Sequence, residues 1–359
     1  MTVQLRLREA SRRCPKRMVY GPCGGVTAGG GCEVPGVRCS FADDAELLTS
    51  LAFSPDDVDA PSSAADSGDA LPAQPRRAAS AAFATRVAAG PVITADLPVR
   101  TVDPGILADA GARLAGLDAV IAGEPVGAPA GLSPTHKALV LTAAGATVIA
   151  GVTCRDRNRV ALEGELAALA DLGVAGVLAV TGDHPVSPAQ PVYDLDSPRV
   201  AALARRAGLF VAVAEQPAAP PTDYRPARLA LKAQAGAELG ILNLCGDLAG
   251  IARFTAALAR TAAPVPVLVS VPVLTSPSAA RRLAALPGVA LPPAVFAAVT
   301  TGNRDAGIRA AAAWGRRAME LPGVVGVHLS AVVDDADEVG LSAVDALVRA
   351  SELLREAAT

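Results

Sequence analysis

The chain has 359 residues and a mass of 35.9 kDa, which is more than one average domain but does not require two. Hydrophobic residues make up 51% and charged residues 19%, so the chain can bury a large core. The net charge of −3 lacks the basic surface that nucleic-acid binding normally needs, which argues against DNA or RNA as partners. The sequence contains neither a run of about 18 apolar residues nor a signal peptide, so we expect a cytoplasmic protein without membrane contact.

Four of the six cysteines crowd a glycine-rich segment near the N-terminus. They are Cys14, Cys23, Cys32 and Cys39. Four thiolates would complete a tetrahedral zinc site or hold a four-iron cluster. The segment has few large apolar residues and no evident core, so we expect a metal to order it. The alternative is four independent reduced thiols in a flexible arm, because the spacing lacks the C-x₂-C motif of zinc ribbons.

Residues 53–78 are rich in Pro, Ser, Ala and Asp without sustained periodicity, which predicts a disordered linker. This linker follows a cysteine-rich module at 1–52 and precedes a domain at 79–359, where short apolar runs alternate with amphipathic stretches. The apolar runs predict eight parallel strands, at 92–97, 118–122, 147–153, 175–180, 209–214, 237–243, 266–271 and 324–329. The stretches between them are long enough for crossover helices, as at 158–172.

Eight strands with intervening helices predict a (β/α)₈ TIM barrel. An open doubly wound sheet shares this alternation and is the structural alternative. However, the G-x-G-x-x-G fingerprint does not follow the first predicted strand, and the P-loop pattern does not occur. We therefore predict a barrel preceded by a small cysteine-rich, metal-binding module.

Polar residues that follow the strands of such a barrel are candidates for chemistry. Asp96 ends the first predicted strand, Glu124 follows the second and Asn243 ends the sixth. The loop after the third strand contains Arg157 and Arg159, which could bind an anion or form internal ion pairs that fix the loop.

The turn after the fourth predicted strand contains Thr181, Gly182 and Asp183. The Asp183 carboxylate could hydrogen-bond the N–H groups of a ligand, or it could cap the following segment. Further along the chain, Arg228 and Lys232 lie four residues apart on one predicted helix face. They could meet a diphosphate there, although such a pair often forms a solvated face.

The segment at 152–185, VTCRDRNRVALEGELAALADLGVAGVLAVTGDHP, resembles the flavin-binding region of the methylenetetrahydrofolate reductase family. The resemblance continues through 191–197, 231–243 and 323–330, and it covers most of residues 90–332. The N-terminal pattern CPKR…GPCGG…CEV…C is similar to the small cysteine domain, resembling a methylenetetrahydrofolate reductase C-terminal domain, that accompanies some bacterial members.

Membership of this family implies a (β/α)₈ barrel that carries FAD and reduces 5,10-methylenetetrahydrofolate to 5-methyltetrahydrofolate. NAD(P)H or another electron donor would reduce the flavin, and the folate would then receive the hydride. The chain would be an oxidoreductase of one-carbon and methionine metabolism. The implied partners are the folate substrate, an electron-transfer or methyltransferase protein, and further copies of the chain.

The resemblance also implies roles for two strand-end residues. Asp96 occupies the place of a family glutamate, the general acid that assists opening of the folate five-membered ring. We expect burial at the barrel mouth to raise the pKa of Asp96. Asn243 occupies the place of a family glutamine that orients the folate.

Cofactor contacts follow from the same resemblance. Asp183 matches a family aspartate beside the flavin pyrimidine that also contacts the folate pterin, so the Thr181–Asp183 turn is expected to lie against the flavin. Lys232, with Arg228 on the same helix face, falls where a contact with the flavin phosphates is expected.

The sequence departs from the family pattern at several of these positions. The changes from Glu to Asp at Asp96 and from Gln to Asn at Asn243 each remove one methylene, and a misplacement of about 1 Å can cost a hundredfold in rate. Family flavin contacts are also replaced near Gly123 and at Gly151. The alternative function is therefore a non-catalytic or auxiliary folate-binding or electron-transfer subunit with a degenerate flavin site.

Overall fold

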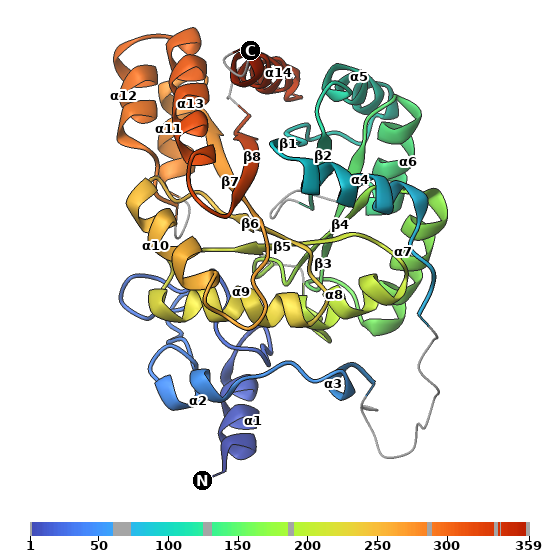
Figure 1. Cartoon of the computed structure of the whole chain (residues 1–359), viewed down its shortest axis with the longest axis vertical. Helices are drawn as coiled ribbons and strands as arrows, with labels where there is room; N and C mark the ends of the chain where they lie inside the picture. The colour runs from blue at the N-terminus through green and yellow to red at the C-terminus, as the bar shows by residue number, and fades with distance from the viewer. Residues whose placement is uncertain are drawn as a thin grey trace.

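The computed structural model describes residues 2–59, 73–124, 131–185, 190–285, 289–333, 337 and 339–356. Its central feature is a closed barrel of eight parallel strands, paired in sequence order with β8 returning to β1 (Figure 1). The strands are β1 (Val92–Asp96), β2 (Ala119–Ala122), β3 (Val148–Thr153), β4 (Gly176–Val180), β5 (Val211–Glu215), β6 (Leu239–Leu242), β7 (Val267–Val273) and β8 (Val324–Ala331). The predicted fold class is confirmed, and every predicted strand lies within two residues of the observed bounds.

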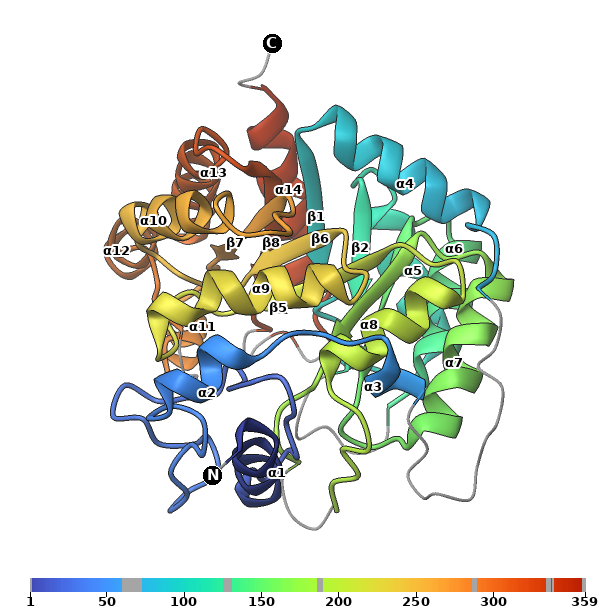
Figure 2. The same ribbon diagram turned by 60° about the horizontal axis from the view of Figure 1, so that its bottom comes forward.

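Helices surround the barrel on its outer face (Figures 1 and 2). They are α5 (Pro104–Leu114), α6 (Pro134–Ala143), α7 (Arg159–Leu172), α8 (Ser197–Arg206), α9 (Arg225–Gln234) with the short η1 (Thr222–Tyr224) before it, α10 (Leu248–Leu258), α11 (Pro277–Ala284), α12 (Pro293–Thr301), α13 (Arg304–Met319) and α14 (Leu341–Glu356). Helix α7 begins where predicted, because the Asn158 side chain accepts a hydrogen bond from the Ala161 amide. It ends at Gly173, whose φ of +79° suits glycine.

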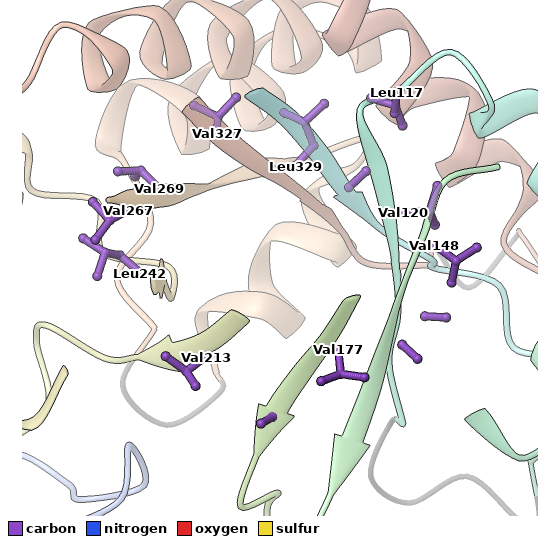
Figure 3. Close-up of a cluster of buried hydrophobic side chains, with 14 of the residues drawn as sticks. Leu117, Val120, Val148, Val177, Val213, Leu242, Val267, Val269, Val327 and Leu329 are labelled. Atoms are coloured by element: carbon purple, nitrogen blue, oxygen red, sulfur yellow. The ribbon is translucent and has the colours of Figure 1, made fainter. Parts of the chain in front are cut away.

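The apolar side chains of the strands point alternately to two separate cores. One core fills the space between the sheet and the helices, and Figure 3 shows part of it, including Val327 and Leu329 of β8. The other lies inside the barrel and is closed by α4 (Ala78–Ala89), whose Phe83 meets Phe210 edge to face at 5.0 Å. The strand position between Val327 and Leu329 therefore faces the barrel interior.

The cysteine-rich module contains α1 (Val3–Arg13) and α2 (Ala45–Ser50), followed by α3 (Asp56–Asp59). The expectation that this segment has no core of its own is wrong. A small apolar cluster joins the two helices and the loop between them, because few but well-spaced large residues converge there. The buried members of this cluster are Ala10, Met18, Phe41, Leu47 and Leu48.

The module packs directly against the barrel, next to α8 and α9 in Figures 1 and 2. The buried Asp196 before α8 accepts hydrogen bonds from the amides of Val19 and Tyr20 at 3.0 and 3.3 Å. The Arg225 guanidinium at the start of α9 donates to the carbonyls of Pro22 and Cys23 at 3.1 and 3.0 Å. These bonds satisfy buried backbone and charged groups, so the module and barrel form one continuous structure.

The predicted linker at 53–78 is described only at its ends, 53–59 and 73–78. At the second end, the amides of Gln74 and Arg77 donate to the carbonyls of Arg206 and Gly208 at 2.7 and 3.0 Å. The middle of the predicted linker lies outside the described residues, so the domain boundaries stay a prediction. In the described part of the chain, no helix combines the length and apolar character needed to cross a membrane.

One buried carboxylate lies beneath the contact between module and barrel. Glu215 at the end of β5 pairs with Arg225 at 3.4 Å, Arg228 at 2.7 Å and Lys232 at 2.8 Å, and all four side chains are buried. These three cations lower the pKa of Glu215 although burial alone would raise it. Burial lowers the pKa of Lys232 to about 8, and Arg228 adds to this effect by repulsion.

We predict that Glu215→Gln lowers the free energy of unfolding by about 3–5 kcal/mol at pH 7, because three buried cations lose their counter-charge. The depressed pKa means that this stabilisation is complete at neutral pH and is lost as acid protonates Glu215. The difference between variant and wild type in urea unfolding should therefore shrink below about pH 4. Glu352→Gln is the control, because its pair with Arg349 is half exposed and worth at most about 1 kcal/mol. A Glu215→Gln loss as small as that of the control would contradict the prediction.

Candidate active site at the mouth of the barrel

Asp96 lies at the end of β1, on the rim of the barrel, where a polar chain connects β1 with β8. Its Oδ1 is 3.0 Å from Nε2 of His328, and its Oδ2 accepts a hydrogen bond of 2.7 Å from the Ser330 hydroxyl. The Nδ1 atom of His328 lies 3.0 Å from the Thr94 hydroxyl. The Asp96 side chain keeps an exposed fraction of 39%, so a ligand in the mouth can reach its carboxyl group.

The expected rise of the Asp96 pKa is wrong. Burial alone would raise it, but the charge and hydrogen bond of His328, together with the Ser330 hydroxyl, lower it. Burial can be expected from the sequence, whereas the histidine that β8 brings opposite β1 depends on the closure of the barrel. At neutral pH Asp96 is therefore held as a carboxylate, which is a poor proton donor without a partner.

The arginines of the loop after β3 form internal ion pairs. Arg157 donates two hydrogen bonds to Glu124, of 2.8 and 2.7 Å, and Glu124 also accepts from the amide and hydroxyl of Thr153 at 3.0 Å. Arg159 pairs with Glu163 at 2.8 Å in the first turn of α7. These contacts favour the loop-fixing alternative over anion binding for both arginines.

The turn after β4 places Thr181, Gly182 and Asp183 beside the loop after β3. Gly182 has a φ of +83°, and a Cβ there would lie 3.1 Å from the Thr153 side chain, so close backbone approach requires glycine. The Thr181 hydroxyl oxygen accepts a hydrogen bond from the Ser197 amide at the start of α8, so this hydroxyl already has a protein partner. The Asp183 residue is exposed to solvent. Its carboxyl group is nevertheless partly desolvated by neighbouring protein atoms, and this desolvation raises its pKa.

The cysteine-rich module contributes charged side chains to this turn. Lys16 is buried and pairs with Glu33 at 2.6 Å, and Glu33 accepts a 2.7 Å hydrogen bond from the His184 amide next to Asp183. The positive charge of Lys16 opposes the rise of the Asp183 pKa, while Glu33 adds to it. Sequence reasoning missed this pair, because 151 residues separate Glu33 from His184.

Asn243 follows β6 and is exposed. Its amide donates to the Glu215 carbonyl at 2.8 Å, and its side-chain oxygen accepts from the Leu244 amide at 2.9 Å. The latter bond turns the side chain toward its own backbone. A folate contact at Asn243 stays a prediction.

Arg228 and Lys232 do not fit the role of flavin-phosphate ligands as they are placed. Both are buried, and both direct their charged groups to Glu215. Lys232 also donates to the Ala214 carbonyl. A phosphate could be bound by these side chains only if their ion pairs with Glu215 broke inside the protein.

The four N-terminal cysteines line one small cavity of about 10 Å³, together with Lys16 and Phe41. All four are free thiols. Burial raises the pKa of Cys14 to about 11, and it also raises the pKa of Cys32 and Cys39. In the described residues, no group of three or more His, Cys, Asp or Glu side chains is arranged to hold a metal ion. The four sulfur atoms are the kind of ligand that zinc and iron prefer, but their arrangement in this structure does not form a coordination site.

The methylenetetrahydrofolate reductase family model matches residues 126–335, which is more than half of the chain. The chain belongs to the methylenetetrahydrofolate reductase family. A second family model, methylene-tetrahydrofolate reductase C terminal, matches residues 10–56 and covers all four clustered cysteines. Both parts of the resemblance stated from the sequence are confirmed, and membership of this family suggests an oxidoreductase. A search of curated proteins gave no match.

Solved structures resemble the barrel at low sequence identity. One is an uncharacterized protein from Clostridium thermocellum, described as binding two copies of 5-methyl-5,6,7,8-tetrahydrofolic acid, with a TM-score of 0.53 and 12% identity over 74% of this chain and 98% of that chain. Another is 2,3-dimethylmalate lyase, with a TM-score of 0.45 and 15% identity over 79% and 87% of the two chains. At this identity the first similarity shows the fold alone.

Two residues of the Asp96 group were missed as site residues from the sequence. His328 and Ser330 lie in a strand that reads as apolar, and only their alternate spacing could have indicated that both face the barrel interior with Thr94. The register of β1 with β8, which pairs Thr94 with His328, brings them together.

Proposed function

We propose that this chain is a methylenetetrahydrofolate reductase-like oxidoreductase that reduces 5,10-methylenetetrahydrofolate to 5-methyltetrahydrofolate in cytoplasmic one-carbon and methionine metabolism. The observation that carries the proposal is a solvent-accessible carboxyl group, that of Asp96, at the end of β1 in a barrel of this family. The Clostridium thermocellum protein of similar fold, which is described as binding 5-methyl-5,6,7,8-tetrahydrofolic acid, supports a folate as the ligand.

Asp96 would act where the folate five-membered ring opens. Protonation of the ring nitrogen breaks its bond to the methylene carbon, and the resulting iminium ion accepts a hydride to become the methyl group. A carboxyl group within about 2.6–3.2 Å of the nitrogen can deliver that proton. Ser330 holds one carboxyl oxygen by its 2.7 Å hydrogen bond and thereby limits rotation of the short Asp96 side chain.

The hydride donor would be FAD reduced by NAD(P)H or by another electron donor. The Thr181–Asp183 turn and Asn243 stay proposed ligand contacts, with Asp183 between the cofactor and the folate pterin. Since Arg228 and Lys232 do not fit the phosphate role, direct transfer from a nicotinamide without flavin is a second form of the same proposal. The flavin content of the purified protein distinguishes the two forms.

The pairing of Arg228 and Lys232 with Glu215 also favours a second candidate function. In this alternative, the chain is an auxiliary folate-binding or electron-transfer subunit with a degenerate flavin site. Its partner would be an electron-transfer or methyltransferase protein, or another copy of the chain. Folate binding without turnover by any hydride donor would favour this alternative.

We predict that Asp96→Asn lowers the rate of methylenetetrahydrofolate reduction about 100-fold or more, because the amide cannot donate the ring-opening proton. Asp96→Glu should preserve or increase the rate, since it restores the length of the family side chain. The measurement is anaerobic folate reduction with reduced flavin, NADH and NADPH as separate donors. Asp109→Asn is the control, because Asp109 is an exposed partner of Arg113 on α5. Wild-type turnover by Asp96→Asn would show that the acid lies elsewhere.

We further propose that Cys14, Cys23, Cys32 and Cys39 bind one metal centre, either zinc or an iron–sulfur cluster. Their convergence on a single cavity supports shared ligation, and four thiolates suit either kind of centre. Because the module packs against the barrel, the metal would order the part of the module that lies beside Asp183, including Lys16 and Glu33.

Cys23→Ser is predicted to release the metal, since a structural centre needs all four ligands. The Cys23 carbonyl accepts a hydrogen bond from Arg225, so loss of the centre should also lower the thermal stability of the whole chain. Metal analysis of anaerobically purified protein, combined with thermal unfolding, measures both effects. Cys245→Ser is the matched control, because this buried cysteine lies after β6, away from the cavity. Stoichiometric metal in Cys23→Ser would contradict shared ligation.

A further inference from the structure

The peptide bond between Asp183 and His184 is held from two sides by hydrogen bonds. Its carbonyl oxygen, on Asp183, accepts from the Tyr193 hydroxyl at 2.7 Å, and its N–H group, on His184, donates to Oε1 of Glu33 at 2.7 Å. The C=O and N–H groups of a planar trans peptide point in opposite directions, so these two bonds together oppose rotation of the peptide plane. Tyr193 belongs to the barrel, whereas Glu33 belongs to the cysteine-rich module.

We propose that Glu33 is a positioning residue that fixes the Asp183 carboxyl group for contact with the ligand in the barrel mouth. This inference rests on the proposed function, in which Asp183 lies between the cofactor and the folate pterin. The barrel itself supplies only the Tyr193 bond, so the module completes the support of the peptide.

Asp183 combines a fixed backbone with a carboxyl group that is open to a ligand. The residue is exposed, and its carboxyl group makes no hydrogen bond or ion pair with another described residue. On the side before Asp183, Gly182 packs closely against the Thr153 side chain. Ordering of a contact group before the ligand arrives reduces the entropy that is lost on binding.

Glu33 is itself held in one place by neighbours within the module. Its carboxylate pairs with Lys16 at 2.6 Å, and the two side chains are 11% and 3% exposed. The same oxygen, Oε1, serves both Lys16 and the His184 amide. A Cβ at Gly25 would overlap Oε2 of Glu33 and lie 2.8 Å from its carboxyl carbon, so glycine is needed there to leave room for the carboxylate.

The pair of Lys16 and Glu33 also connects the clustered cysteines with the Asp183 turn. Glu33 directly follows Cys32, and Lys16 lies two residues after Cys14 and lines the cysteine cavity. The order of the cysteine segment therefore determines where the carboxylate that supports Asp183 lies.

The test measures binding of 5-methyltetrahydrofolate to the full chain by anaerobic isothermal titration calorimetry. Gly25→Ala should displace the Glu33 carboxylate and weaken binding about tenfold or more, which corresponds to one hydrogen bond with a charged group. Gly29→Ala is the matched control in the same module, because a Cβ there meets no atom within 4 Å. Since Gly25 lines the cysteine cavity, the metal content of each variant is measured as well.

Two substitutions at Glu33 separate positioning from neutralisation of Lys16. Glu33→Ala removes both the counter-charge of Lys16 and the acceptor for the His184 amide. Glu33→Gln also removes the charge, but its side-chain oxygen can still accept from the His184 N–H group. We expect Glu33→Ala to weaken folate binding about tenfold or more and Glu33→Gln to weaken it less. A role confined to the charge of Lys16 predicts equal losses.

The hydrogen bond itself can be followed without any ligand. The chain has three histidines, so ¹⁵N-histidine labelling gives few backbone amide signals, and that of His184 is assigned by its loss in His184→Gln. The His184 signal should move in Gly25→Ala and in Glu33→Ala, whereas the amide signals of His136 and His328 should stay in place.

An unmoved His184 signal in Glu33→Ala would overturn the inference, because the amide would then not depend on Glu33. Equal affinity of Glu33→Ala and wild type for folate, or equal losses in Glu33→Ala and Glu33→Gln, would overturn the inference alone and leave the proposed function standing. A wild-type chain that binds no folate would overturn both, so the two failures are distinguishable.

Discussion

The burial of the Glu215 carboxylate with three cations is the constraint on which the arrangement of module and barrel depends. Arg228 and Lys232 hold one carboxylate oxygen, and Arg225 approaches the other while it also donates to two carbonyls of the cysteine-rich module. A buried cation without its counter-charge is strongly unfavourable, so ionised Glu215 helps to keep Arg225 in place, together with the carbonyls of Ala219 and Pro220, which accept from its guanidinium. The end of β5 thus fixes the module beside the barrel mouth.

This arrangement gives the cysteine-rich module a place in the site. Lys16 and Glu33 reach the turn that carries Asp183, and their charges act on its carboxyl group in opposite directions. A structural change at the clustered cysteines would therefore alter the charges around Asp183, on the β4 side of the mouth. The Asp96 and His328 pair lies on β1 and β8, and in the described part of the chain its hydrogen-bond partners, Thr94 and Ser330, belong to the barrel.

Sequence patterns predicted the local structure well, because strand alternation and helix caps depend on neighbouring residues. The eight strands, the start of α7 at Asn158 and the family were all readable from the chain. Two features were not readable, because each depends on residues far apart in the sequence: the contact of Arg225 with Cys23 and the pairing of His328 with Asp96. The pairing of Arg228 and Lys232 with Glu215 joins residues 13 and 17 positions apart, and it depends on how α9 packs against the end of β5.

Module and barrel form one structure joined at buried polar contacts, and native-state hydrogen exchange tests this most directly. The amides of Val19 and Tyr20 donate to the buried Asp196, so they should exchange nearly as slowly as amides of the barrel strands. Arg225→Met should speed their exchange at least tenfold while leaving the β2 and β3 amides unchanged. Fast exchange of both module amides in wild type, at the rate of an unstructured segment, would contradict the claim.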